Sequence, residues 1–133
     1  THIAYCFAEV RGFSKFGSYT GNSNVNGPFI YCGFKPGFVL IKNLSTSNHW
    51  LILDTKRSVF NKTDDALFPN ENSAEQVDQS SASGINIVSN GFKIRTTGNA
   101  AANYNNNNGD NYLFAAFAEA PLVGSNNVTA TAK

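Results

Sequence analysis

Short apolar runs recur along the whole chain, and residues that favour turns separate them. The runs are rich in Phe, Tyr, Ile, Val and Leu, the residue types that strands favour. Asn, Gly, Pro and Ser fill the gaps, and these residues favour turn geometry. A helical composition occurs only at residues 72–80, which have no clean apolar stripe. The pattern predicts strands over residues 3–10, 16–20, 29–34, 38–42, 50–54, 85–89, 92–97 and 112–119.

Asn90-Gly91 is the sharpest of the turn signals. Apolar segments flank it directly, and an Asn-Gly pair supplies the positive φ angles that a type I′ turn requires. The sequence therefore predicts a tight hairpin over residues 85–97. In its second strand Lys93 and Arg95 alternate with apolar or small residues. This alternation indicates that one face of the strand is buried and the other is exposed to solvent.

Two strands differ from this alternating pattern, because residues 38–42 and 50–54 are apolar on both faces. We expect both to lie in the middle of a sheet, in the core. Trp50 is then a core anchor rather than a platform for stacking a sugar. Asp54 is expected to accept turn amides or to pair with Arg57. Residues 58–84 have few strand signals and most of the acidic residues, which predicts a surface excursion anchored near residues 67–69.

The composition is that of one folded domain. The chain has 133 residues, of which 41% are hydrophobic, and a net charge of +1 that does not favour nucleic acid. Asn occurs 19 times and indicates many turns. No apolar run approaches the ~20 residues of a membrane span. We expect an all-β, antiparallel β-sandwich of the jelly-roll or concanavalin type over residues 1–133.

The sequence offers little chemistry for catalysis. No serine lies in a nucleophile elbow, and neither His2 nor His49 has a second ligand at metal-binding spacing. Cys6 and Cys32 are within apolar runs, which favours buried free thiols over a disulfide. We therefore expect no catalytic residues, no metal and no cofactor.

The run of asparagines at residues 105–108 leads into Gly109 and Asp110. It resembles a calcium loop only weakly, because such loops use several carboxylates. A polar hairpin loop is the favoured interpretation, and residues 103–111 are expected to form an exposed tip. Asn105, Asn107 and Asp110 are the candidate ligand-binding residues, whose amides and carboxylate could contact a glycan.

The two ends of the chain contain similar segments. Phe7-Ala8-Glu9 matches Phe117-Ala118-Glu119, and both triplets follow apolar runs. Residues 1–10 are therefore interpreted either as the closing strand of a preceding unit or as a strand shared across a joint. The chain has no initiator Met, so we expect a segment of a longer tandem-repeat or fibrous protein, although chance similarity of short strands is an alternative.

Several segments together carry a family resemblance: "FAEVRGFSKFGSYTGN", "GPFIYCGFKPGFVLIKN", "HWLILDTKR", "SNGFKIRTTG" and "YLFAAFAEAP". As a set they resemble an uncharacterised β-rich domain of phage tail-fibre-like and other virion structural proteins. That domain often lies beside concanavalin- or laminin-G-like domains. The resemblance covers roughly residues 5–121 and carries no catalytic residues.

The resemblance implies a non-enzymatic structural module of a phage virion, in a tail fibre, in a spike or as a capsid decoration. Such a module would assemble with other virion proteins and with copies of itself, as a trimer or higher homo-oligomer, on the surface of the extracellular particle. Contact with a host surface glycan is a further expectation. The alternative from another class is a carbohydrate-binding module of a secreted protein.

Overall fold

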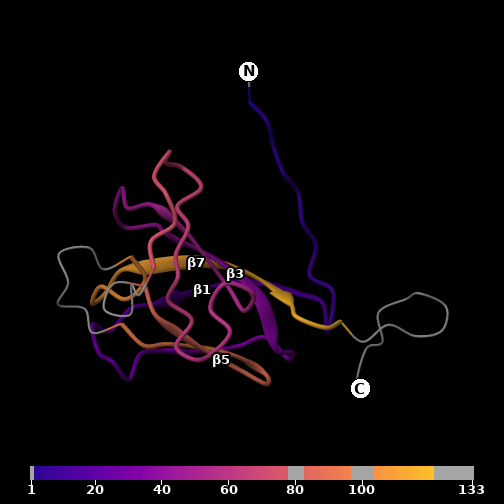
Figure 1. The fold of residues 1–133 in the computed structure, drawn as a ribbon. Helices are drawn as coiled ribbons and strands as arrows, with labels where there is room; N and C mark the ends of the chain where they lie inside the picture. The colour runs from indigo at the N-terminus through magenta and orange to yellow at the C-terminus, as the bar shows by residue number, and fades with distance from the viewer. Residues whose placement is uncertain (1, 78–82, 97–103, 122–133) are drawn as a thin grey trace.

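The computed structural model describes residues 2–77, 83–96 and 104–121. In this part of the chain seven strands form two antiparallel sheets that pack face to face (Figure 1), which confirms the all-β prediction. The strands are β1 (Ser14–Thr20), β2 (Phe29–Tyr31), β3 (Pro36–Asn43), β4 (Trp50–Asp54), β5 (Ile85–Val88), β6 (Gly91–Ile94) and β7 (Asn111–Ala118). One sheet has the order β1-β7-β3-β4, and the other has the order β2-β6-β5.

The core lies between the two sheets. Alternate residues of β3, β4 and β7 face inward, and they meet the isoleucines and Phe92 of the smaller sheet. The rings of Phe92 and Phe114 cross this boundary edge to face, with their centroids 5.5 Å apart. Every other side chain of the larger sheet therefore faces the core, as the period of a strand requires.

Seven of the eight predicted strands are confirmed, with bounds that shift by a few residues. The prediction of a strand over residues 3–10 is wrong, because residues 2–9 join neither sheet. The central place of residues 38–42 is confirmed, since β3 lies between β7 and β4. Residues 50–54 were expected in mid-sheet as well, yet β4 is an edge strand.

The hairpin of β5 and β6 is confirmed, but its turn is not the predicted one. Val88 pairs with Gly91, so the two turn residues are Ser89 and Asn90. Neither Asn90 nor Gly91 is among the residues with positive φ, which excludes a type I′ turn at this site. Thr97, the last residue of the predicted second strand, lies outside the described residues.

Gly91 is needed for a different reason, which is the close approach of β2. A Cβ atom at this position would lie 2.0 Å from the carbonyl oxygen of Ile30. The same turn also receives hydrogen bonds from β2, because the backbone N–H of Cys32 donates to the carbonyl oxygen of Asn90. The glycine therefore permits the β2–β6 pairing.

The acidic excursion is anchored more widely than the sequence predicts. Leu67 exchanges two backbone hydrogen bonds with Ile52 of β4, and Thr63 does the same with Ile85 of β5. Ala66 and Phe68 are buried in the core. This segment therefore covers the outer edges of both β4 and β5, which protects them from pairing with other chains.

We predict that Gly91→Ala destabilises the fold by about 1–3 kcal/mol, because the new methyl group would force β2 away from β6. Ser89→Ala is the matched control in the same turn. Ser89 is exposed, so its replacement should stay within about 0.5 kcal/mol of the parent. Chemical denaturation measures both. Equal stability of the two variants would contradict the role given to Gly91.

Candidate functional site

The outer face of the four-stranded sheet is apolar over its centre. One row across the strands consists of Phe16, Ala115, Leu40 and Ile52, which lie side by side in the register of the sheet. The neighbouring rows add further apolar side chains, namely Phe38, Trp50, Leu113 and Phe117. An antiparallel sheet of a sandwich usually has a polar outer face, so this surface is unusual.

Two shallow grooves run over this outer face. The first, of about 480 Å³, is lined by the aromatic side chains of Tyr5, Phe7, Phe16 and Trp50, together with residues of β3 and β7. The second, of about 440 Å³, shares Tyr5 and Trp50 with the first and extends to Pro69 and Asn70. The linings of both grooves contain no charged side chain. We call them together the outer grooves.

Trp50 is part of this surface and not of the core. Its side chain is 38% exposed, whereas its neighbours Leu51 and Leu53 are fully buried. The prediction of Trp50 as a core anchor is therefore wrong, while the core prediction holds for Leu51 and Leu53. The physical reason is the strand period, which turns Trp50 and Ile52 outward whenever Leu51 faces inward.

Residues 2–9, which we call the arm, leave the sandwich as an extended segment (Figure 1). Its alternate apolar side chains are largely in solvent: Ile3 is 79% exposed, Tyr5 81% and Phe7 68%. Only Phe7 packs on the sheet through its ring, whose centroid lies 5.9 Å from that of Phe16 and 6.2 Å from that of Phe117. Three large apolar side chains in a row thus lack a full partner in this chain.

The base of the arm is fixed at the edge of β1. Val10 forms an isolated bridge with Ser14, and the Glu9 carboxylate accepts hydrogen bonds from the Lys15 ammonium and the Phe16 backbone N–H. The Lys15 hydrogen bond, followed by that of Phe16, lowers the pKa of Glu9. Glu9 and Lys15 thus form an ion pair, with the Lys15 ammonium 2.9 Å from the carboxylate.

Glu119, the counterpart of Glu9 at the other end, has separate partners. Its carboxylate lies 2.6 Å from the Lys35 ammonium and accepts a hydrogen bond from the Thr55 hydroxyl. These two contacts lower the pKa of Glu119, with that of Lys35 the stronger. Each glutamate is thus neutralised by its own lysine, and neither carboxyl has the raised pKa of a general acid.

The Asn-rich loop is mostly a buried polar network and not an exposed tip. Asn105 and Asn106 are completely buried. The Asn105 amide donates to the Ser83 carbonyl oxygen, and its side-chain oxygen accepts from the Thr96 hydroxyl. The expectation of an exposed tip is wrong for these two residues. Residue 103, where the expected tip begins, lies outside the described residues.

Asn106 ties three segments together at this end of the sandwich. Its amide donates to the carbonyl oxygens of Thr96 and Asn24, at 2.8 and 2.9 Å, and its side-chain oxygen accepts from the Asn22 N–H at 3.0 Å. The backbone carbonyl of Asn106 also accepts from Ser23. This side chain therefore gives the buried Thr96 carbonyl a partner and holds the loop of residues 22–24 against this end of the sandwich.

The other two candidate ligand residues of the loop are also engaged. The Asn107 amide donates to the Asp110 carboxylate at 3.0 Å, and Asn43 of β3 donates to the same carboxylate at 2.8 Å. Tyr112 accepts from the Asn107 backbone N–H, and burial raises the pKa of its hydroxyl to about 12. Between Tyr104 and Asp110, Asn108 and Gly109 are the exposed residues.

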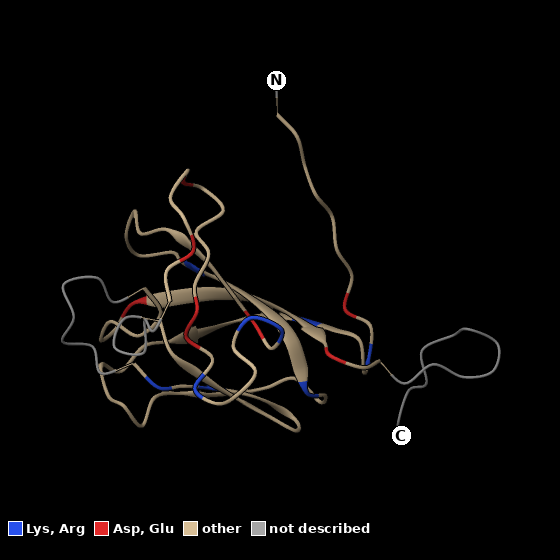
Figure 2. Cartoon of the chain, in the orientation of Figure 1, with Lys and Arg blue, Asp and Glu red and all other residues tan. Residues whose placement is uncertain are grey.

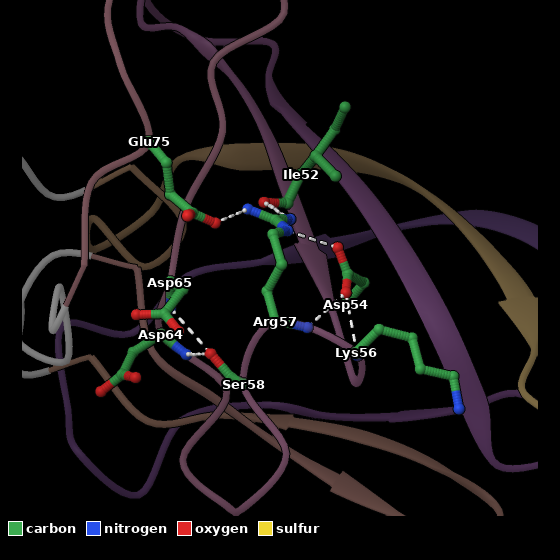
Figure 3. Close-up of polar contacts among 8 residues, drawn as sticks. All are labelled: Ile52, Asp54, Lys56, Arg57, Ser58, Asp64, Asp65 and Glu75. Carbon is green, nitrogen blue, oxygen red and sulfur yellow. Dashed lines mark hydrogen bonds and ion pairs between the residues drawn. The ribbon is translucent and has the colours of Figure 1, made fainter.

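Asp54 and Arg57 form a structural cluster after β4 (Figure 3). The Arg57 guanidinium donates to Asp54 at 2.6 Å and to Glu75 at 2.9 Å, and the Asp54 carboxylate also caps the backbone N–H groups of Lys56 and Arg57. Desolvation raises the pKa of Asp54, but these hydrogen bonds outweigh it and lower the pKa overall. The prediction that Asp54 accepts turn amides or pairs with Arg57 is confirmed in both respects. Through Glu75 the cluster also attaches the acidic excursion to β4.

Clusters typical of metal or catalytic sites are not evident in the described residues. No three His, Cys, Asp or Glu side chains among them are placed to hold a metal ion. Cys6 is exposed on the arm and Cys32 is buried, and both are free thiols. The expectation of burial is therefore wrong for Cys6.

His49 lies 3.0 Å from the Glu71 carboxylate at the surface. None of the described segments is a helix long and apolar enough to cross a membrane.

A comparison with family models assigns the chain to a protein family. Residues 1–121 match the model of a domain of unknown function, DUF7483, and the chain therefore belongs to that family. No curated protein and no solved structure matches the chain. The surface with the clearest functional signal is therefore identified from geometry alone, and it is the outer face with its grooves and the arm.

We predict that Asn106→Ala destabilises the fold by about 1–3 kcal/mol, because it removes the amide that donates to the buried Thr96 carbonyl oxygen. Asn108→Ala, in the same run of asparagines but exposed, is the control and should change stability by less than about 0.5 kcal/mol. Thermal and chemical unfolding compare the two. Similar small effects of both substitutions would show that the network is dispensable.

Proposed function

We propose that this member of the DUF7483 family is a non-enzymatic structural module of a phage virion, which assembles with other virion proteins and with copies of itself. The observation that carries the assembly role is the apolar outer face of the four-stranded sheet. Aromatic and aliphatic side chains lie there in adjacent rows, and the arm beside them exposes three more. Contiguous apolar surface of this kind marks protein contacts.

The contrast with the other sheet supports a specific role for this face. Asn86 and Lys93 pair across β5 and β6, and both are polar and outward-facing. Phe29 and Tyr31 of β2 are also exposed on this outer face, beside Lys93 and Gly91 of β6. The outer face of the smaller sheet is therefore mixed, whereas one row of the larger sheet is apolar across all four strands. This continuous apolar row favours a surface that another protein covers in the assembled state.

The placement in a virion derives from the resemblance of the quoted segments to phage structural proteins. On this proposal the module lies at the surface of the extracellular particle, in a tail fibre, spike or capsid decoration, as a trimer or higher homo-oligomer. It has no need of nucleic acid, and its net charge of +1 agrees with that. Contact with a host glycan is assigned to the exposed tip at Asn108 and Gly109.

A carbohydrate-binding module of a secreted protein is the second candidate, and one observation favours it. Trp50 is exposed next to Asn70 and Tyr5, a combination of aromatic faces and an amide that sugar sites use. The linings of the outer grooves nevertheless contain few polar groups. A sugar would leave most of its hydroxyls unpaired there, so the structural proposal is preferred.

The assembly role predicts that Leu113→Asp weakens association. Leu113 is 42% exposed on the outer face, so a carboxylate there should leave the fold intact and weaken self-association by about tenfold or more. Ser89→Asp adds the same charge on the other sheet and is the control. Sedimentation equilibrium measures both. Unchanged association of folded Leu113→Asp would overturn the role, and loss of glycan binding instead would favour the second candidate.

The virion assignment predicts that antibodies against the folded chain label intact particles. Immunogold electron microscopy of purified phage from a culture that expresses the chain should show label at one defined part of the particle. Mass spectrometry of the same particles should detect residues 2–121 as part of a structural protein. Complete particles that lack both signals would overturn the assignment.

A further inference from the structure

The arm and the outer grooves are chemically alike. Residues 2–8 carry no Asp, Glu, Lys or Arg, and Figure 2 shows the arm without charge colours until Glu9 at its base. The lining of the outer grooves is uncharged as well. An uncharged apolar groove accepts an uncharged apolar segment without leaving a buried charge unpaired.

The arm of the same chain does not fill these grooves. Tyr5 touches them from one side, yet its side chain is 81% exposed, and Ile3 near the end of the arm is 79% exposed. The N-terminal end of the arm points away from the sheet (Figure 1). The arm therefore borders the outer grooves of its own chain and leaves them open.

The arm is also prevented from pairing with β1 of its own chain. The bridge between Val10 and Ser14 begins an antiparallel ladder, whose next hydrogen bonds would join Ala8 and Phe16. The Glu9 carboxylate already accepts from the Phe16 N–H at 3.3 Å and so replaces that pair. The ladder stops after one bridge, and the arm turns out of the plane of the sheet.

Residues 2–8 are long enough to cross the outer face of the sheet. Seven extended residues span about 23 Å, at roughly 3.3 Å per residue. Four strands spaced at about 4.8 Å are roughly 15 Å wide between the outer strand axes. An arm that approaches from a neighbouring molecule can therefore cross the whole outer face and bring its alternate side chains into both grooves.

We propose that the arm of one copy of this chain lies in the outer grooves of a neighbouring copy. The inference rests on the proposed function, because it names the partner that covers the apolar face. Ile3 and Tyr5 enter the grooves of the neighbour and pack on Trp50 and Leu113, while Phe7 stays on Phe16 and Phe117 of its own sheet. The intervening residues of the arm face the other way.

A second copy is favoured over an unrelated protein by the sequence of the arm itself. Ile3, Tyr5, Phe7 and Glu9 have the same spacing as Leu113, Ala115 and Phe117, the outward residues of β7, and Glu119, which follows the strand. The arm thus has the pattern of a strand that already belongs to this face. Each copy has one arm and one set of grooves, so the contact repeats from copy to copy and closes a ring when the rotation permits.

Disulfide trapping tests whether the arm reaches another copy. One variant carries Ile3→Cys and a second carries Leu113→Cys, both with Cys6→Ser, so that the exposed native thiol does not react. After mixing and mild oxidation we expect a covalent heterodimer on non-reducing gels, identified by mass. Ser89→Cys with Cys6→Ser replaces the Leu113 variant as the control, and it should give no more than background cross-linking.

A chain that carries both Ile3→Cys and Leu113→Cys distinguishes the two places the arm can lie. Covalent dimers and longer chains support the proposal. A disulfide within a single chain, with no heterodimer from the mixed variants, overturns it and shows that the arm covers its own sheet. Free thiols throughout also overturn it.

Deletion of residues 2–8, compared with Leu113→Asp, distinguishes a failure of the arm proposal from a failure of the proposed function. If both hold, the deletion and Leu113→Asp should each weaken self-association, the deletion by about 30-fold or more, as for the loss of an aromatic anchor. If Leu113→Asp weakens association and the deletion does not, the face binds another protein surface and the arm is not its partner. If neither change has an effect, the proposed function itself fails.

Discussion

The fold is governed by a sheet that is apolar on both faces and has only one face covered. In β3 and β7 the inward residues are Val39, Ile41, Phe114 and Ala116, and the outward rows beside them are apolar too. Burying the inner rows against the smaller sheet forms the core, since burial of apolar side chains is the main favourable term in folding. The period of two then fixes where the outer rows point, and no described segment covers them fully. The outer grooves, and the apolar arm beside them, lie on the face of this sheet that stays uncovered.

A second constraint acts at the end of the sandwich, where loops enter the interior. A buried loop brings backbone N–H and C=O groups that need partners. Asn105 and Asn106 provide them, because a single amide side chain both donates and accepts hydrogen bonds. The two asparagines therefore act as core residues, although their type indicates turns and surface. Asn108 in the same run is exposed, as asparagines in turns usually are. Residues of one type in one run can therefore be either core or surface residues.

The sequence predicts the strands well and the environment of single residues less well. Period-two patterns and turn residues are local properties, and they locate all seven strands of the described chain, including the β5–β6 hairpin. The misplaced residues depend on distant contacts. Gly91 is required by β2, which is sixty residues earlier in the chain, and Asn105 is buried by Ser83 and Thr96. Trp50 is in an apolar run, which does not reveal that one face of β4 is left uncovered. The arm could be foreseen as a second copy of the β7 pattern, whereas the grooves beside it emerge only when four strands lie in register.

The two similar segments at residues 7–9 and 117–119 have different structures, because their neighbours in the fold differ. At residues 117–119 the motif closes β7, which pairs with β1 on one side and β3 on the other, and Glu119 reaches Lys35 beyond the end of the strand. At residues 7–9 the same residues precede the turn into β1, and Glu9 folds back onto Lys15 and the Phe16 N–H. A glutamate that ends a paired strand in one place therefore prevents strand pairing in the other. The apolar residues before it have the same pattern in both, so the arm retains the features of a sheet strand without a sheet of its own. Its burial then requires a surface supplied from outside its own sandwich.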